Sequence, residues 1–125
     1  MTSGETVLRI GRGMKELTRG LTELGDVLDA NGVGARGRFQ AELVFEEMVT
    51  NVVDHARTPF RLVVRLNQTI LHIAVHDHSP QQVRVQALDL GRPRGRGLLM
   101  IAGIATRWGS DADDNGKTMW AEISI

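Results

Sequence analysis

Residues Phe45–Ala56 read FEEMVTNVVDHA, and this stretch decides the fold. Its apolar residues recur at intervals of three and four, which is typical of the buried face of a helix. Glu47, Asn51 and His55 follow one another at intervals of four, so they form a stripe at the margin of that face. The stretch therefore predicts a core helix that carries a carboxylate, an amide and an imidazole at the rim of the core.

A solvated helix face is the alternative explanation of this stripe, with Glu46 as one more ordinary charge. Asn51 favours a functional explanation. An asparagine in the middle of a helix competes with the backbone for hydrogen bonds, so helix propensity gives no reason for it to be there.

Two helices are predicted before residue 60. The first runs from about Arg12 to Ala30 and is ended by Asn31-Gly32. The second runs from Ala35 or Arg36 to Ala56, because the residue before Pro59 avoids helical geometry. Their apolar faces are Met14, Leu17, Leu21, Leu24 and Leu28 on the first, and Ala41, Val44, Phe45, Met48, Val49 and Val52 on the second.

A hairpin is predicted next, because residues 60–66 and 71–77 both alternate between apolar and polar side chains. The inward positions are Phe60, Leu62, Val64 and Leu66 on one strand, and Leu71, Ile73, Val75 and Asp77 on the other. Asp77 thus ends an apolar strand face with a carboxylate. It can accept hydrogen bonds from a ligand amino group, or it can cap the following turn with Ser79 and Pro80.

The remaining chain predicts a loop over His78–Arg94, then a helix over Gly97–Ile104 that is opened by Gly95-Arg96-Gly97. Glycines at a helix start let the backbone approach a phosphate closely. A strand near Ala105–Ser110, an acidic turn over Asp111–Gly116 and a last strand over Lys117–Ile125 complete the expected order of elements. Gly116-Lys117-Thr118 is no P-loop, because it enters a strand instead of a helix.

Composition bounds the function. The chain has 125 residues, with 15 Lys and Arg against 15 Asp and Glu, no net charge and no cysteine. These numbers predict one domain over residues 1–125, exclude disulfides and thiolate metal sites, and disfavour direct nucleic-acid binding. No apolar run exceeds four or five residues and no export signal is visible, so we expect no membrane span and a cytoplasmic location.

The only basic surplus is local. Arg84, Arg92, Arg94 and Arg96 gather where Asp89 is the one acid, which predicts a lid that orders over an anionic ligand, or a merely solvated loop. His72, His76 and His78 share one strand face. Three ligands on one strand make a poor zinc cage.

Taken in chain order, these features resemble the sequence boxes of the GHKL ATPases: Glu47-x-x-x-Asn51 on a helix, Asp77 at a strand end, and Gly95-x-Gly97-Leu98 at a helix start. Within that superfamily the chain resembles the anti-sigma-factor serine/threonine kinase group, particularly its short bacterial members. The similarity extends from the first helix to the last strand, and the matching stretches are Phe45–Ala56, Gly95–Ile101, Arg107–Gly109 and Gly116–Glu122.

The resemblance implies a two-layer α/β sandwich of the Bergerat type, with a mixed, mostly antiparallel sheet, helices on one face, and ATP as ligand. It implies that Asn51 holds Mg²⁺ and that Glu47 acts as general base or orients the acceptor. Asp77 would accept the adenine amino group, and Gly95, Arg96, Gly97 and Leu98 would lie against the phosphates. Asp54 would at most support the metal ligand.

This chain departs from the family pattern in two places that bear on adenine. Asp77-His78-Ser79 stands where the family has Asp-x-Gly, and Lys117 stands where a threonine often follows the glycine of the last strand. Strand parity points Met119, Ala121 and Ile123 inward, and therefore Lys117 as well.

The resemblance implies an ATP-dependent serine/threonine kinase that phosphorylates an anti-sigma factor antagonist of the STAS type and sequesters a sigma factor. A homodimer is compatible with this function. The alternative is a nucleotide-binding regulatory module of the same fold without kinase activity, which the missing glycine after Asp77 favours. A histidine kinase is disfavoured, because no histidine precedes His55 to serve on a separate phosphoacceptor helix.

Overall fold

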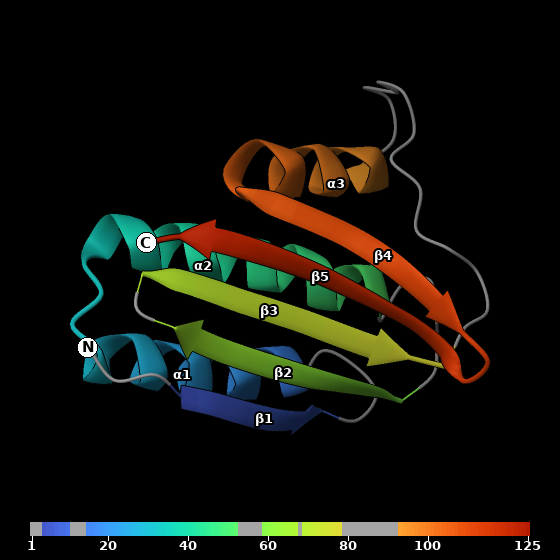
Figure 1. The fold of residues 1–125 in the computed structure, drawn as a ribbon, viewed down its shortest axis with the longest axis horizontal. Helices are drawn as coiled ribbons and strands as arrows, with labels where there is room; N and C mark the ends of the chain where they lie inside the picture. Colours follow the sequence, from blue (N-terminus) through green and yellow to red (C-terminus); the bar gives the residue numbers. More distant parts are fainter. Residues whose placement is uncertain (1–3, 11–14, 53–58, 68, 79–92) are drawn as a thin grey trace.

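The computed structural model describes residues 4–10, 15–52, 59–67, 69–78 and 93–125. Within these residues, three helices lie on one face of a five-stranded sheet (Figure 1). The helices are α1 (Lys15–Ala30), α2 (Ala35–Asn51) and α3 (Pro93–Ile104). The strands are β1 (Gly4–Ile10), β2 (Phe60–Asn67), β3 (Ile70–Asp77), β4 (Arg107–Asp113) and β5 (Gly116–Ser124).

The sheet has the strand order β1-β2-β3-β5-β4, and each of these neighbouring pairs is antiparallel. The two-layer α/β sandwich with helices on one face is therefore confirmed. A mixed, mostly antiparallel sheet was expected, but all four strand pairs that the structure describes are antiparallel. The order also brings β3 and β5 together at the centre, although a helix and a strand separate them in the sequence.

Helix α1 ends where the sequence predicts. Gly32 adopts φ 69°, a left-handed conformation that favours glycine. The amide of Val33 donates to the carbonyl of Leu28, and the amide of Gly32 donates to that of Asp29, which together form a Schellman motif. The chain thus turns immediately into α2.

Helix α2 is the central helix of the layer, lying between α1 and α3 and against β3 and β5. Each residue of its predicted apolar face is buried, namely Ala41, Val44, Phe45, Met48, Val49 and the flanking Val52. The helix is assigned as far as Asn51, and its expected continuation through Asp54 and His55 lies outside the described residues.

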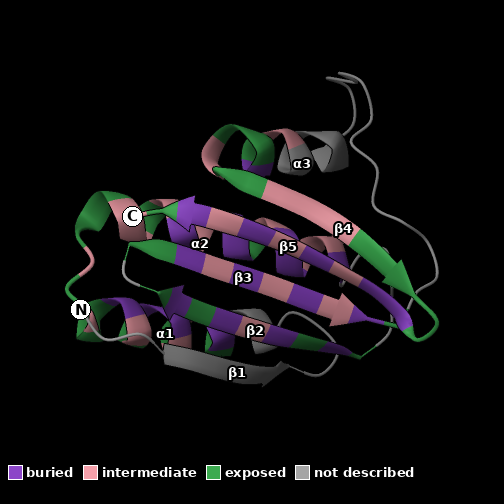
Figure 2. Ribbon diagram, in the orientation of Figure 1, coloured by how far each residue is buried: buried purple, intermediate pink, exposed green. Residues whose placement is uncertain are grey.

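The predicted hairpin is confirmed, with Leu62 opposite Val75 and Val64 opposite Ile73. All eight predicted inward positions of the hairpin are buried, including Asp77. Figure 2 shows the alternation as bands of burial along β2 and β3. The sheet therefore presents one apolar face to the helices and one polar face to solvent.

Two expectations about element bounds are wrong, and one strand was missed. An acidic turn was expected over Asp111–Gly116, but Asp111 and Asp113 lie in β4 and only two residues, Asp114 and Asn115, connect it to β5. β4 is an edge strand, where charged side chains reach water. Helix α3 begins at Pro93 instead of Gly97, since proline suits the first helical turn. Strand β1 was not predicted, because its sequence GETVLRI does not alternate regularly between apolar and polar residues.

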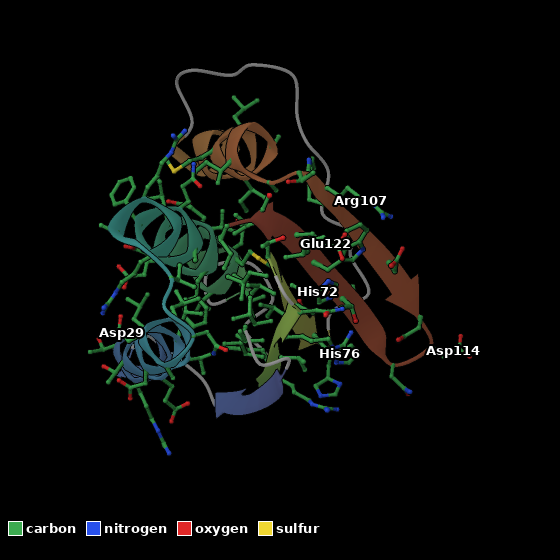
Figure 3. The ribbon with its side chains drawn as sticks, turned by 60° about the vertical axis from the view of Figure 1, so that its left-hand side comes forward. Asp29, His72, His76, Arg107, Asp114 and Glu122 are labelled. Atoms are coloured by element: carbon green, nitrogen blue, oxygen red, sulfur yellow. The ribbon has the colours of Figure 1, made fainter. Side chains whose placement is uncertain are left out.

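The face of the sheet opposite the helices carries an aromatic and charged cluster, which we call the open-face cluster: His72, Trp120, Glu122 and Arg107. The His72 ring stacks on Trp120 at 6.0 Å between ring centroids, and its Nδ1 lies 3.3 Å from Glu122 Oε2. The Arg107 guanidinium lies 5.7 Å from the Trp120 ring centroid. Figure 3 shows Arg107, Glu122 and His72 on this side of the sheet. Trp120 is thus a surface anchor, whereas Trp108 packs against the core.

Candidate nucleotide-binding site

Four elements converge at one end of the sandwich. Helix α2 and strand β3 both run toward this end, and β5 and α3 both start from it (Figure 1). The last residue of α2 is Asn51 and that of β3 is Asp77, while Gly116 begins β5. The fold therefore gathers at one end the predicted site residues that are far apart in sequence.

Glu47 and Asn51 are both half-buried on α2, one helical turn apart. Burial raises the pKa of the Glu47 carboxyl above its ordinary value, and the nearby negative charge of Glu46 raises it further. Glu46 itself is exposed. Glu47 therefore keeps its proton to a higher pH than an ordinary glutamate, a property suited to a general base.

Asp77 is only 1% exposed, and its register partner on β5 is Lys117, which is 5% exposed. Lys117 Nζ lies 3.9 Å from Asp77 Oδ2. A buried carboxylate is costly unless an opposite charge is nearby, and Lys117 supplies that charge. The inward direction of Lys117 predicted by strand parity is confirmed, but no sequence signal showed that β3 and β5 would place the two charges together.

Gly116 packs directly on the backbone of Asp77 and His78, at the end of β3. Its φ of 140° is accessible mainly to glycine, and a Cβ built there would overlap the carbonyl oxygen of Asp77 and lie 2.7 Å from the Cα of His78. His78 Nδ1 also lies 3.1 Å from the carbonyl oxygen of Asn115. The glycine that allows close approach at the Asp77 turn thus comes from β5, and sequence reasoning missed it.

Replacing Gly116 with alanine is expected to destabilise the fold by about 2–3 kcal/mol, because backbone strain and steric overlap both act there. Gly32→Ala is the matched control, since Gly32 also has positive φ but nothing within 4 Å of an added Cβ. It should cost about 1–2 kcal/mol, the conformational penalty alone. Urea unfolding measures both variants, and equal losses would show that the contact with Asp77 is unimportant.

Gly95, Arg96, Gly97 and Leu98 lie within the first half of α3. Because α3 begins at Pro93, Gly95 falls in the first turn, where backbone amides have no partner within the helix. Gly97 lies one turn further in. The start of α3 therefore favours an anion, although the contacts of these four residues with phosphate remain predictions. The predicted arginine lid falls mostly on residues 79–92, which lie outside the described residues.

The histidines of the open face have partners other than a metal. His76 Nε2 lies 3.9 Å from Asp113 Oδ2, and the His76 and His78 rings meet edge to face with centroids 5.5 Å apart. Among the residues that the structure describes, no three His, Cys, Asp or Glu side chains are grouped so as to hold a metal ion. In the same part of the chain, no helix is long and apolar enough to cross a membrane.

A two-layer sandwich with a buried aspartate at a strand end and an amide-bearing central helix is the arrangement expected from the sequence for a nucleotide-binding ATPase domain. The family model for the histidine kinase-like ATPase domain matches residues 14–123, and the chain belongs to this family. Its membership implies that it binds ATP. No curated protein sequence matches the chain at a significant level.

Among solved structures, the chain is similar to the histidine kinase AdeS of Acinetobacter baumannii, with a TM-score of 0.55. The two are 13% identical, and the match covers 100% of this chain and 69% of the other. At this identity the similarity establishes the fold alone, and it agrees with the GHKL resemblance.

The described residues fit a Mg²⁺-bound adenine nucleotide. Oxygen atoms are the protein ligands that Mg²⁺ prefers, and the half-buried Asn51 at the end of α2 carries an amide oxygen. A buried carboxylate such as Asp77 suits the exocyclic amine of adenine, which needs an acceptor.

Proposed function

We propose that this chain is an ATP-dependent serine/threonine kinase of the anti-sigma-factor type. The observation that carries the proposal is the half-buried pair on α2, in which Glu47 has a raised pKa and Asn51 stands one turn away at the end of the helix. This pair provides a general base and an oxygen ligand side by side, as phosphoryl transfer requires.

In the proposed reaction the bound Mg²⁺-ATP supplies the phosphoryl group. Glu47 accepts the proton of the acceptor serine or threonine hydroxyl, whose oxygen forms the new bond to phosphorus as ADP leaves. Asn51 would hold Mg²⁺, which would neutralise phosphate charge. Asp77 would accept a hydrogen bond from the amino group of adenine, and the start of α3 from Gly95 to Leu98 would lie against the phosphates.

Nucleotide binding is the first test. A ligand that binds only the folded state stabilises it by RT ln(1 + [L]/Kd), so Mg²⁺-ATP at about 100 times Kd should add about 2.7 kcal/mol. A thermal shift measures this, with Mg²⁺-GTP as the control nucleotide. An unchanged melting temperature at millimolar Mg²⁺-ATP would remove the basis of the proposal.

Phosphoryl transfer is the second test, using ATP labelled at the γ-phosphate and a cognate antagonist protein of the STAS type. Wild type should label the antagonist, and Asn51→Ala should not. Thr50→Ala is the matched control, because Thr50 is the half-buried neighbour of Asn51 on the same helix. Labelling by Asn51→Ala at the wild-type rate would contradict the assigned role.

A non-catalytic nucleotide-binding regulatory module is the second candidate function. It is favoured by Ser79, which stands where the family has a glycine after the aspartate. Such a module would show the thermal shift with ATP but would transfer no phosphate.

The proposed partners are the antagonist protein and a sigma factor, and the proposed location is the cytoplasm, where ATP is available. The open-face cluster supports a protein partner, since Trp120 and Arg107 belong to the residue types that anchor protein interfaces. A homodimer is also compatible with this proposal.

A further inference from the structure

Lys117 is an unusual residue to find in a candidate nucleotide site. Its side chain is 6% exposed and that of Asp77 is 1% exposed, and the two face each other across the central strand pair. Lysine is almost never fully buried unless it is paired. The position of Lys117 therefore calls for an explanation beyond ordinary surface chemistry.

The distance between the two groups is too long for a hydrogen bond between them. Lys117 Nζ and Asp77 Oδ2 are 3.9 Å apart, whereas a charge-assisted hydrogen bond between such groups spans about 2.7–2.9 Å. The charges attract each other at this separation, but the Lys117 ammonium donates no hydrogen bond to Asp77 Oδ2. An ammonium has three N–H donors.

Adenine presents two neighbouring groups on its Watson–Crick edge, a 6-amino group that donates and a ring nitrogen N1 that accepts. A carboxylate beside an ammonium is the complementary pair. We propose that Lys117 is a second base-reading residue, whose ammonium donates a hydrogen bond to N1 of the adenine that Asp77 holds by its amino group. This inference rests on the proposed function, because it assigns the base to the Asp77 end of the sandwich.

Asp77 and Lys117 would together distinguish adenine from guanine, each at one position of the purine ring. Guanine carries an oxygen where adenine has its amino group, and an N–H where adenine has an accepting N1. An oxygen then faces the Asp77 carboxylate and a donor faces the Lys117 ammonium, so both contacts are lost. Lys117 thus adds to the discrimination that Asp77 makes alone, because each mismatched group is left without its hydrogen bond.

A cycle of two ligands and two matched variants tests this assignment. The ligands are ATP and 1-deaza-ATP, which keeps the amino group but has C–H in place of N1. The variants are Lys117→Gln and Lys117→Met, both uncharged and of similar length. They share the cost of removing the positive charge, and they differ in that glutamine retains a donor.

Titration calorimetry should show wild type binding ATP at least tenfold more tightly than 1-deaza-ATP, which corresponds to about 1.4 kcal/mol. Lys117→Gln should keep much of this preference, and Lys117→Met should bind the two ligands within about twofold, as expected when a donor to N1 is removed. Circular dichroism and a thermal melt verify that each variant is folded. The wild-type comparison needs no substitution, so the inference is testable even if Lys117→Met does not fold.

Two results separate this inference from the proposed function. If wild type binds ATP and 1-deaza-ATP equally, or Lys117→Met keeps the full preference for ATP, then Lys117 does not contact N1, although the kinase proposal stands. If wild type binds neither nucleotide, the proposed function itself fails and the base-reading role fails with it.

Discussion

Replacing Glu47 with glutamine is expected to slow phosphoryl transfer by about 10²–10⁴-fold, the usual contribution of a general base. Glutamine has nearly the same shape but cannot accept the hydroxyl proton at neutral pH. ATP affinity should change little, because the nucleotide is held by other residues. Single-turnover transfer to the antagonist protein measures the rate, and calorimetry measures the affinity.

The same substitution should make the fold more stable at neutral pH. The pKa of Glu47 is raised above its ordinary value of 4.5, so the folded chain holds this proton more tightly than the unfolded chain does. The stabilisation linked to Glu47 is therefore complete below pH 4.5 and is lost as the pH rises through the folded-state pKa. Glutamine never ionises, so the variant avoids that loss.

Urea unfolding at pH 4 and pH 7 checks the direction of this pH dependence of the free energy of unfolding. The advantage of Glu47→Gln over wild type should be larger at pH 7. Glu46→Gln is the matched control, because Glu46 is exposed and contributes only the second of the two causes that raise the pKa. Its pH-dependent gain should be smaller. If Glu47→Gln slows the reaction but gives no gain in stability, the catalytic role of Glu47 is supported and the stability prediction from its raised pKa is wrong.

The parts of the fold that the sequence predicts best are those with a strong local period. The apolar faces of α2 and of the β2–β3 hairpin follow from spacings of three, four and two, and the structure buries them as expected. The end of α1 follows from Gly32, whose local geometry needs no partner from elsewhere in the chain. In these elements the decisive contacts lie close in sequence.

The parts that sequence reasoning missed depend on long-range pairing. Strand β1 becomes a strand by pairing with β2, which is about fifty residues away, with Leu8 opposite Leu62. The Asp77–Lys117 contact and the packing of Gly116 on Asp77 both require that β3 and β5 be neighbours. Parity along one strand gives the side on which a residue lies, but it does not identify the neighbouring strand.

This dependence on the β3–β5 pairing also changes what Asp77→Asn should do. On the sequence alone, the substitution would weaken ATP binding and leave the fold intact. In the structure it removes the charge beside the buried Lys117 ammonium. Breaking a buried ion pair from one side costs about 3–5 kcal/mol, because the remaining charge stays buried without compensation.

The matched control is Asp113→Asn. Asp113 lies 3.9 Å from His76 Nε2, the same separation as in the buried pair, but its side chain is 56% exposed. An exposed pair contributes about 0–1 kcal/mol, so this substitution should be nearly neutral. Urea unfolding of the two variants compares the buried Asp77–Lys117 pair with an exposed contact of equal length between Asp113 and His76, which is charged only if protonated.

A double variant completes the test. Asp77→Asn combined with Lys117→Met removes both charges, so most of the stability lost in Asp77→Asn should return. The double variant should nevertheless bind ATP at least tenfold more weakly than wild type, since neither group that reads the base remains. If Asp77→Asn is as stable as Asp113→Asn, the buried contact with Lys117 does not contribute to the free energy of unfolding. Asp77 and Lys117 would then act on the nucleotide alone.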